Sequence, residues 1–329
     1  MLDVSVVIVS FNTASLLADC LDSVYGKHTE LVQKSETGSD RSPLARNSEP
    51  TIPQEVIVVD NASTDGSRDM VSRRFPQVVL IANEDNRGFA AANNQAMQIA
   101  SGRHVLLLNS DTLVLADAIP KLAGFLDQNP AVAVASAQLQ NPDGTHQHSA
   151  FRFPSLLMTF FDFFPINHRL SNSRLNGRYP VPHDDRPVEI DHPLGACMMI
   201  RRQVIDEVGM FDEQFFMYCE EIDWCLRMKK KGWRLYCLPA ARIVHYGGQS
   251  ARQIRGAMYA ELFKSRARLN RKHHSYLFCL AARLIMKLGF WREGRRAERR
   301  FRAGSLDADG LGQELGTLKL ARLAVDSFA

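Results

Sequence analysis

Residues 4–10 read VSVVIVS and residues 55–60 read EVIVVD, two short β-rich runs that are apolar without alternation. Continuous apolar character indicates strands covered on both faces, as in a parallel sheet. Two further runs follow, VVLIA at residues 78–82 and RHVLLL at residues 103–108. Apolar residues recur at helical spacing from Leu16 to Val24, and further helices are expected around residues 68–75 and at residues 88–99.

Strand and helix therefore alternate four times at short spacing, which is typical of a doubly wound α/β domain with a mostly parallel sheet. Ligands of such sheets bind at the carboxyl ends of the strands. Polar residues gather at all four ends, at 10–12, 60–63, 83–86 and 109–111. Strand ends always carry polar turns, but four ends rich in Asn, Asp and Ser favour one shared ligand site.

The periodicity weakens after Asp111. Residues 151–190 are rich in aromatic residues and proline and are expected to form an irregular segment over the sheet. The run GACMMIR at 195–201 predicts a strand, and residues 222–231 predict a helix. Residues 27–54 are polar and charge-balanced, which predicts a flexible surface insertion.

The chain has 329 residues, of which 45% are hydrophobic and 23% charged, as in a soluble globular protein. None of its six cysteines forms a CxxC pair, so we expect reduced thiols and a cytoplasmic protein. The start lacks the basic region of a secretory signal. The apolar stretch at 276–291 is interrupted by Arg283 and Lys287, which argues against a membrane-spanning helix.

Seven segments in order resemble family 2 glycosyltransferases with the GT-A fold: VVIVSFN, VIVVDNASTDGS, EDNRGFAAANNQA, LLLNSDT, GACMMIRR, FDEQFFMYCEEIDWCLR and VHYGGQS. The resemblance is greatest to bacterial rhamnosyltransferase-type members. It implies an inverting transfer of a hexose from a nucleotide-diphosphate sugar to a hydroxyl of a glycan or lipid-linked glycan in cell-surface polysaccharide synthesis. It also implies a GT-A domain over residues 1–250 and a basic helical extension over residues 251–329.

The nucleotide is expected to lie along the first strand ends. Asp60 ends the second strand, where a carboxylate can accept from a nucleobase imide or from ribose hydroxyls, and the family places a nucleotide-contacting Asp there. Gly88 would let the backbone pass close to a ligand. The full expected set is Ser10, Asn12, Asp60, Asn61, Asn86, Arg87, Gly88 and Asn109.

Asn109-Ser110-Asp111 occupies the place of the family's DxD metal motif, with Asn at its first position. Hard cations such as Mg²⁺ or Mn²⁺ take oxygen ligands and keep water and phosphate in their shell. One carboxylate, Asp111, is therefore enough when a diphosphate supplies the rest. His245 matches a family histidine that can complete the shell, although a lone histidine is as often structural.

Glu220, Glu221 and Asp223 place three carboxylates within four residues, a cluster that tends to raise some pKa values and suits a general base. The family pattern is Glu-Asp with the second acid as base, which implies Glu221 here. Glu220 and Asp223 remain alternatives, and acids at a helix start also suit the helix dipole. The preceding aromatic residues, FFMY, are candidates for an acceptor platform.

Residues 252–302 hold 15 Lys and Arg against three Asp and Glu. We expect an interfacial helix on an anionic membrane rather than nucleic-acid binding, with a solvated helix bundle as the alternative. Two other functions are weighed. A nucleotidyltransferase would need a glycine-rich basic loop, which SFNTASLL is not, and a non-catalytic sugar-nucleotide-binding protein would not need Asp111 or Glu221.

Overall fold

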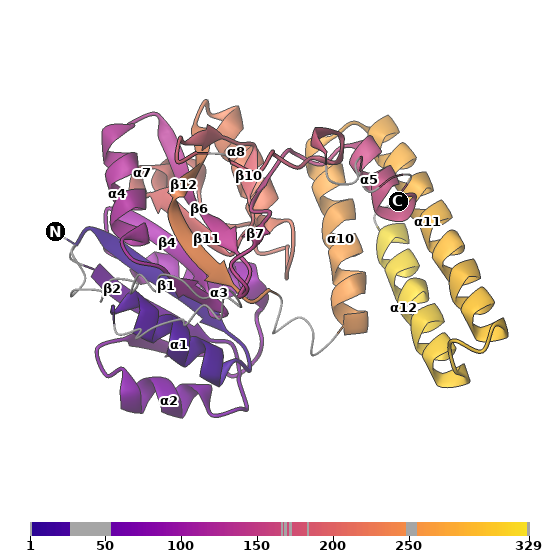
Figure 1. The fold of residues 1–329 in the computed structure, drawn as a ribbon, viewed down its shortest axis with the longest axis horizontal. Helices are drawn as coiled ribbons and strands as arrows, with labels where there is room; N and C mark the ends of the chain where they lie inside the picture. Colours follow the sequence, from indigo (N-terminus) through magenta and orange to yellow (C-terminus); the bar gives the residue numbers. More distant parts are fainter. Residues whose placement is uncertain are drawn as a thin grey trace, which may run out of the picture.

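The computed structural model describes residues 2–26, 54–165, 167, 170, 173–182, 184–247 and 255–327. Figure 1 shows a sheet with helices on both faces, beside a bundle of long helices formed mostly by the C-terminal part of the chain. The expected insertion lies outside the described residues, except that Gln54 is the first residue of a strand.

The four strands expected from the apolar runs are confirmed, and they lie side by side in parallel. They are β1 (Val4–Ser10), β2 (Gln54–Asp60), β3 (Val79–Ala82) and β4 (His104–Asn109), in the spatial order β3-β2-β1-β4. The expected fifth strand is β11 (Cys197–Arg201), which runs antiparallel to β4.

The sheet continues beyond β11 with strands that the sequence did not predict. β6 (Val132–Gln140) pairs antiparallel with β11, and β12 (Arg234–His245) runs parallel to β6. The short β5 (Thr112–Val114) closes the order, while β7 (His146–Gln147) pairs with β6 and β9 (Val188–Glu189) with β12. β11 is thus a reversed strand inside a mostly parallel sheet.

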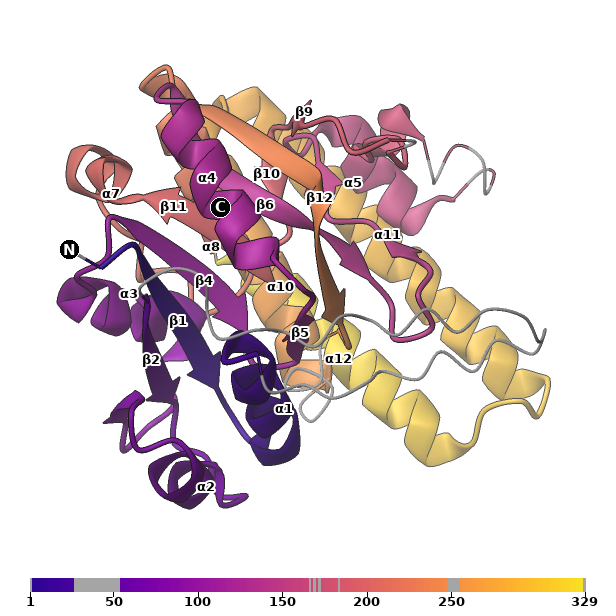
Figure 2. The same cartoon turned by 60° about the vertical axis from the view of Figure 1, so that its left-hand side comes forward.

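Each face of the sheet is covered by helices, which explains why the strands are apolar without alternation. Val6 and Ile8 face a core with α1 (Ala14–Val24), α2 (Ser67–Arg74) and α4 (Ala118–Gln128), whereas Val7 faces the opposite core. That second core is covered by α3 (Gly88–Ile99), α7 (Arg202–Val208) and α8 (Glu220–Lys230). In Figure 2, α4 lies in front of the sheet and α8 behind it.

The C-terminal part forms α10 (Arg255–His273), α11 (Tyr276–Arg302) and α12 (Ala308–Asp326). Phe163, Phe263 and Phe290 meet at the centre of this bundle, with ring centroids 4.8–5.5 Å apart; Phe163 stacks on Phe263, and Phe290 contacts both edge to face. Phe163 ends α5 (Leu156–Phe163), so the expectation of an irregular segment over the sheet is wrong for this stretch. α5 is instead a helix that packs on α11, where Gly289 leaves room for the Phe163 ring.

As far as it is described, the rest of residues 151–190 is closer to the expected irregular chain, with a short 3₁₀ turn at Arg174–Asn176 and the two-residue strand β9. A two-stranded sheet of β8 (Ala150–Phe151) and β10 (His192–Pro193) joins its two ends. All six cysteines lie in the described part of the chain and none forms a disulfide. Among the described helices, none combines the length and apolar character needed to cross a bilayer.

Candidate active site

The carboxyl ends of the parallel strands bring the expected polar residues to one edge of the sheet. In the strand register Ser10 lies beside Asp60, and Val9 lies beside Asn109. His245 at the end of β12 pairs with Thr112, and the amide of the next residue donates to the carbonyl of Asp111. The sequence prediction that these residues share one region is therefore confirmed.

Asp60 has one carboxylate oxygen engaged and one free. Oδ1 accepts from Arg68 Nε at 2.6 Å and from the amide of Ser63 at 3.0 Å. Oδ2 is buried and has no hydrogen-bond partner. A buried oxygen without a donor is costly in the free protein, and it is suited to accept from a ligand N–H or hydroxyl.

Most of the expected asparagines hold the site loops together. Asn12 Oδ1 accepts from the amide of Thr64 at 2.8 Å. Asn61 donates to Asn86 Oδ1 at 2.8 Å and accepts from the amide of Arg87 at 3.0 Å. These side chains position the loops after β1, β2 and β3, a role that the strand-end pattern alone does not reveal.

Ser10 and Arg87 also have protein partners. Ser10 Oγ lies 3.0 Å from Thr13 Oγ1, which lies 2.9 Å from Ser110 Oγ, so the hydroxyls form a buried chain between β1 and the turn after β4. The half-exposed Arg87 guanidinium lies 3.5 Å from Asp85.

Gly88 begins α3 with φ +83°, and a Cβ there would collide with the carbonyl oxygen of Phe216. The amide of Phe89 donates to the same oxygen at 2.7 Å. From the sequence we expect a ligand to pass close to this glycine, whereas in the structure the Phe216 carbonyl explains why a side chain cannot fit here. The close neighbour is the protein's own loop before α8.

Asp111 and His245 face each other at the strand ends, with Asp111 Oδ1 3.4 Å from His245 Nε2. On the other side of the ring, His245 Nδ1 lies 2.7 Å from Gln147 Oε1. A carbonyl oxygen can only accept, so Nδ1 carries a proton, and in the neutral imidazole Nε2 presents its lone pair. Nε2 is buried without a hydrogen-bond partner, which is the arrangement of a metal-binding imidazole.

The chain supplies few of the ligands that a metal would need. Among the described residues, no three His, Cys, Asp or Glu side chains are arranged to hold an ion. Asp111 and His245 therefore fit a divalent cation only where a substrate diphosphate and water complete the shell. Gln147 was missed by sequence reasoning, because it lies 98 residues from His245 and no motif marks it.

Glu220 and Glu221 open α8, and each has a buried Oε2 without a hydrogen-bond partner. Burial raises the pKa of Glu221 to about 7. Burial and then the Glu221 charge raise the pKa of Glu220 well above its ordinary range. A carboxyl with its pKa near neutral pH can exchange a proton under the conditions in which a general base works.

The Glu221 side chain lies against Gly195, within 3.8–3.9 Å of where a Cβ would be. The carbonyl of the next residue, Ala196, accepts from the amide of Asn109 at 3.0 Å. Through this short link the proposed base stands beside the end of β4, where the Asn109-Ser110-Asp111 turn begins.

Asp223 is a poor candidate for the base. It is fully buried, and it accepts from Arg227 Nε at 2.9 Å, Lys272 Nζ at 2.8 Å and His273 Nε2 at 2.7 Å. Burial acts to raise its pKa, but the hydrogen bonds from Lys272, His273 and Arg227 outweigh this effect and lower it. The fallback assignment of Asp223 is therefore corrected to an anchoring role.

The loop before α8 is held from two sides, by α3 through Phe216 and by α10. Ser265 Oγ donates to the Met217 carbonyl at 2.8 Å, and Leu269 packs on the buried Phe215. Tyr218 and Cys219 have φ of +69° and +67°, a conformation that is costly for residues with a Cβ. Phe215 is only 1% exposed, so the expectation of an acceptor platform is wrong for this residue.

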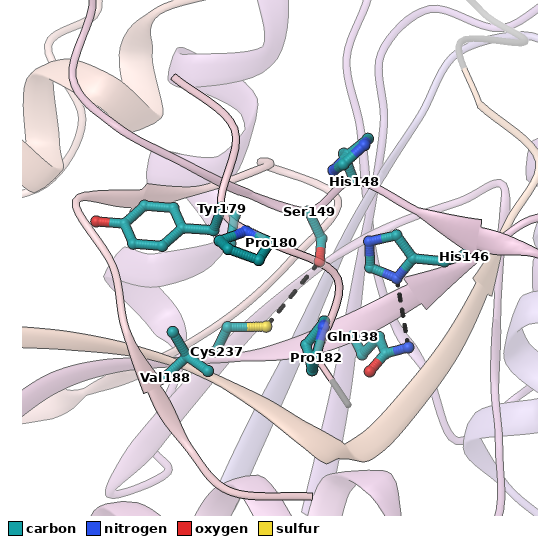
Figure 3. Close-up of a pocket in the computed structure, with 10 residues that line it drawn as sticks. Gln138, His146, His148, Ser149, Tyr179, Pro180, Pro182, Val188 and Cys237 are labelled. Carbon is teal, nitrogen blue, oxygen red and sulfur yellow. Dashed lines mark hydrogen bonds between the residues drawn. The ribbon is translucent and has the colours of Figure 1, made fainter. Parts of the chain in front are cut away.

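A separate small pocket lies beyond β7, and it contains none of the residues expected from the sequence. His146, His148, Tyr179 and Cys237 are among its lining residues. Figure 3 shows His146 directed at Gln138, and Ser149 directed at Cys237. Burial lowers the pKa of both histidines.

The strand-end edge, the facing Asp111 and His245, and the two glutamates with raised pKa together form the candidate site on an α/β sheet. Comparison with known families agrees. Residues 5–209 match the model "Glycosyl transferase family 2". The chain belongs to this family, and it is an inverting glycosyltransferase, as the sequence predicted.

Several curated relatives are rhamnosyltransferases. The chain is 28% identical over 214 residues to the N-acetylglucosaminyl-diphospho-decaprenol L-rhamnosyltransferase of Mycobacterium tuberculosis, covering 60% of this chain and 68% of that protein. It is 26% identical over 175 residues to the rhamnosyltransferase WbbL of Escherichia coli, covering 51% and 64%. It is 24% identical over 204 residues to the dTDP-rhamnosyl transferase RfbF of Shigella flexneri, covering 61% and 62%.

Solved structures share the fold. A mannosyltransferase from Pyrobaculum calidifontis, solved with GDP-Man and Mn²⁺, matches with a TM-score of 0.54 and 18% identity, covering 98% of this chain and 88% of that one. GalNAc-T7, solved with UDP, GalNAc and Mn²⁺, matches with a TM-score of 0.53 and 17% identity, covering 74% and 43%. At this identity the likeness extends to the fold.

Proposed function

We propose that this protein transfers a hexose, with rhamnose the first candidate, from a nucleoside-diphosphate sugar to a hydroxyl of a lipid-linked glycan. One observation carries the proposal. Six buried side-chain atoms in the described part of the chain have no hydrogen-bond partner. Five of them belong to Asp60, Asn109, Glu220, Glu221 and His245, all at the strand-end edge or at the start of α8. Buried polar atoms are normally paired, so this concentration supports a polar ligand there.

The donor is proposed to lie along the strand ends, with Asp60 Oδ2 accepting from the nucleobase or ribose. Asp111 and His245 would hold a divalent cation, Mg²⁺ or Mn²⁺, which would offset the negative charge that develops on the departing diphosphate. The side chains of Asn12, Asn61 and Asn86 act by fixing the loops around the donor. Ser10, Arg87 and Gly88 shape the same region.

The acceptor is proposed to enter from the side of α8. Glu221 takes the proton from the acceptor's hydroxyl group while the hydroxyl oxygen bonds to the anomeric carbon of the donor sugar. The bond from that carbon to the diphosphate oxygen breaks at the same time, and its electron pair leaves with the nucleoside diphosphate. A single displacement of this kind inverts the anomeric centre.

The choice of sugar and acceptor rests on the relatives. Three curated relatives carry rhamnosyl transfer in their names, one of them from a dTDP donor and another onto a diphospho-decaprenol glycan. From the lipid in that acceptor we propose that the reaction takes place at the cytoplasmic face of a membrane.

Donor specificity is tested by thermal shift with dTDP, UDP and GDP, each with Mn²⁺, Mg²⁺ or EDTA. A ligand that binds only the folded protein raises its melting temperature. We expect the largest rise with dTDP and metal, and a loss of the metal-dependent part in Asp111→Asn. Equal shifts with and without metal would refute the metal site, and no shift with any nucleotide would refute the donor site.

Transfer itself is tested with dTDP-rhamnose and a synthetic polyprenyl-diphospho-N-acetylglucosamine, with product mass as the readout. UDP-glucose and GDP-mannose serve as competing donors. Transfer from either of these in place of dTDP-rhamnose would overturn the sugar assignment and leave the reaction class intact.

A further inference from the structure

Helix α11 leaves one face uncovered. Ala282, Met286, Phe290 and Ala297 turn toward the bundle core and are buried. On the opposite face five large apolar side chains follow each other at steps of three or four residues. Each is between 50% and 74% exposed, and we name this set the α11 stripe: Leu277, Leu280, Leu284, Leu288 and Trp291.

The stripe is unusual for this protein. Fifteen large hydrophobic residues are exposed in the described part of the chain, and seven of them lie on α11. Those on the sheet domain are scattered singly, as is normal for a protein surface. A contiguous apolar strip on one helix face marks an interaction surface instead.

The same face turns basic where the stripe ends. Continuing the spacing beyond Trp291 leads to Arg295, Arg299 and Arg302, all of them exposed. α11 holds eight Lys and Arg against two Asp and Glu. The only acid on this face is Glu298, which pairs with Arg295 at 3.6 Å. The stripe thus combines apolar side chains with a surplus of positive charge.

We propose that the α11 stripe docks on the surface of an anionic lipid bilayer, with α11 lying parallel to the membrane plane. The leucines and Trp291 would enter the boundary between headgroups and acyl chains, and the arginines would contact lipid phosphates. The positive charge of this face favours an anionic bilayer over a second copy of the chain as its partner. A second copy of this chain would bring more arginines and almost no carboxylates to the same face, whereas an anionic bilayer complements it.

Membrane docking is separate from the transfer reaction, but it would bring the site close to a lipid-linked acceptor. α11 packs on the same bundle as α10, and α10 holds the loop that precedes Glu221. A bundle docked on the bilayer would therefore keep the glutamate end of the site near lipid-linked acceptors.

The test is flotation of the full-length protein with vesicles of phosphatidylglycerol and phosphatidylcholine, compared with phosphatidylcholine alone. We expect binding to the anionic vesicles that weakens as salt rises. Replacing Leu280, Leu284 and Leu288 together by Ser should weaken it about 10- to 100-fold, because each removes apolar area from the contact. The matched control replaces the equally exposed Val79, Ile99 and Leu175 by Ser and should bind like wild type.

Two further measurements keep the test decisive. Nucleotide binding by thermal shift must be unchanged in both variants, which shows that they fold and separates this inference from the donor proposal. Trp291 fluorescence should shift to the blue on anionic vesicles, and Trp291→Phe should abolish the shift, since Trp224 is buried and Trp233 lies on the sheet domain, hydrogen-bonded to Glu207.

Three results would overturn the inference. The first is equal binding to neutral vesicles, and the second is wild-type binding by the leucine variant. The third is a wild-type dimer that ignores vesicles and that the leucine variant converts to monomers, which would assign the stripe to a second copy of the chain.

Discussion

His245 Nε2 lies 3.4 Å from Asp111 Oδ1, and Gln147 Oε1 accepts a hydrogen bond from Nδ1 of the same ring at 2.7 Å. The imidazole is thereby fixed in one tautomer and one orientation before any ligand binds. Partners of this kind around a metal-binding histidine commonly change metal affinity 10–100-fold when they are removed.

Gln147→Ala should therefore weaken Mn²⁺-dependent nucleotide binding by roughly 10–100-fold while leaving binding in EDTA unchanged. Calorimetric titration with and without Mn²⁺ measures both values. Gln138→Ala is the control, because the Gln138 side chain hydrogen-bonds to His146 in the pocket next to β7, away from His245 Nδ1. A loss of the same size in the Gln138 variant would point to general loosening of β6 and β7.

Glu221→Gln should lower the single-turnover rate by about 10²–10⁴ and leave donor affinity intact, since the amide keeps the size of the side chain but cannot take a proton. Glu220→Gln is the matched control. Glu220 lies in the same helix turn but is not the proposed proton acceptor, so its amide variant should turn over close to wild type. If Glu220→Gln is inactive and Glu221→Gln is active, the roles of the two acids are reversed.

The rate should also depend on pH through Glu221. Because its pKa is raised to about 7, the single-turnover rate should climb with pH and level off above about 7.

The raised pKa of Glu221 means that its protonated form is favoured in the folded protein. The free energy of unfolding should accordingly fall as pH rises from about 4.3, the ordinary value for Glu, through about 7. Glu221→Gln should lose this part of the stability profile, as measured by urea unfolding at several pH values.

Asp223→Ala should destabilise the protein by about 3–5 kcal/mol, because it leaves Arg227, Lys272 and His273 without their carboxylate partner at a buried position. Asp69→Ala removes a carboxylate from an exposed pair with Arg73 and should have no measurable effect. The folded pKa of Asp223 is lowered, so its contribution is present above about 3.9 and is lost as pH falls through the folded value. Urea unfolding at pH 7 and in acid should show the difference between wild type and Asp223→Ala shrinking in acid.

Gly88→Ala should cost about 1–3 kcal/mol or more, because it combines a positive φ with a collision against the Phe216 carbonyl. Gly124→Ala in α4 meets open space and should instead stabilise by roughly 0.5–1 kcal/mol. Thermal unfolding of the two variants gives the comparison. Equal effects would show that the loop before α8 moves freely away from α3.

Much of the sheet could be predicted because its strands are apolar on both faces, and Val6, Val7 and Ile8 in β1 show this directly. The parallel order then placed Asp60, Asn109 and Asp111 at one edge without further information. β6 escaped prediction because the chain between β5 and β11 has no repeated pattern. β12, which follows α8, escaped because its pairing with β6 is interrupted by a register shift between Leu238 and Arg242.

The roles of individual side chains were harder to predict. Asn61 and Asn12 are residue types that often contact ligands, yet their side chains hydrogen-bond to other loops of the protein. Asp223 reads like a third candidate base, and only the fold brings Lys272 and His273 to it from about 50 residues away. Such pairings depend on tertiary contacts, which leave no periodic trace in the sequence.

The contacts that α10 makes with α8 and the loop before it limit how this enzyme can be joined to parts of other enzymes. α10 supplies Ser265 to the loop that leads to Glu221, and Lys272 and His273 to Asp223. A chimera that joined this sheet domain to another enzyme's C-terminal helices near residue 250 would place foreign side chains against that loop. The segment from Phe211 to Lys230 and the helices after residue 255 would have to be exchanged together. The two segments therefore form one structural unit, which crosses the division near residue 250 expected from the sequence.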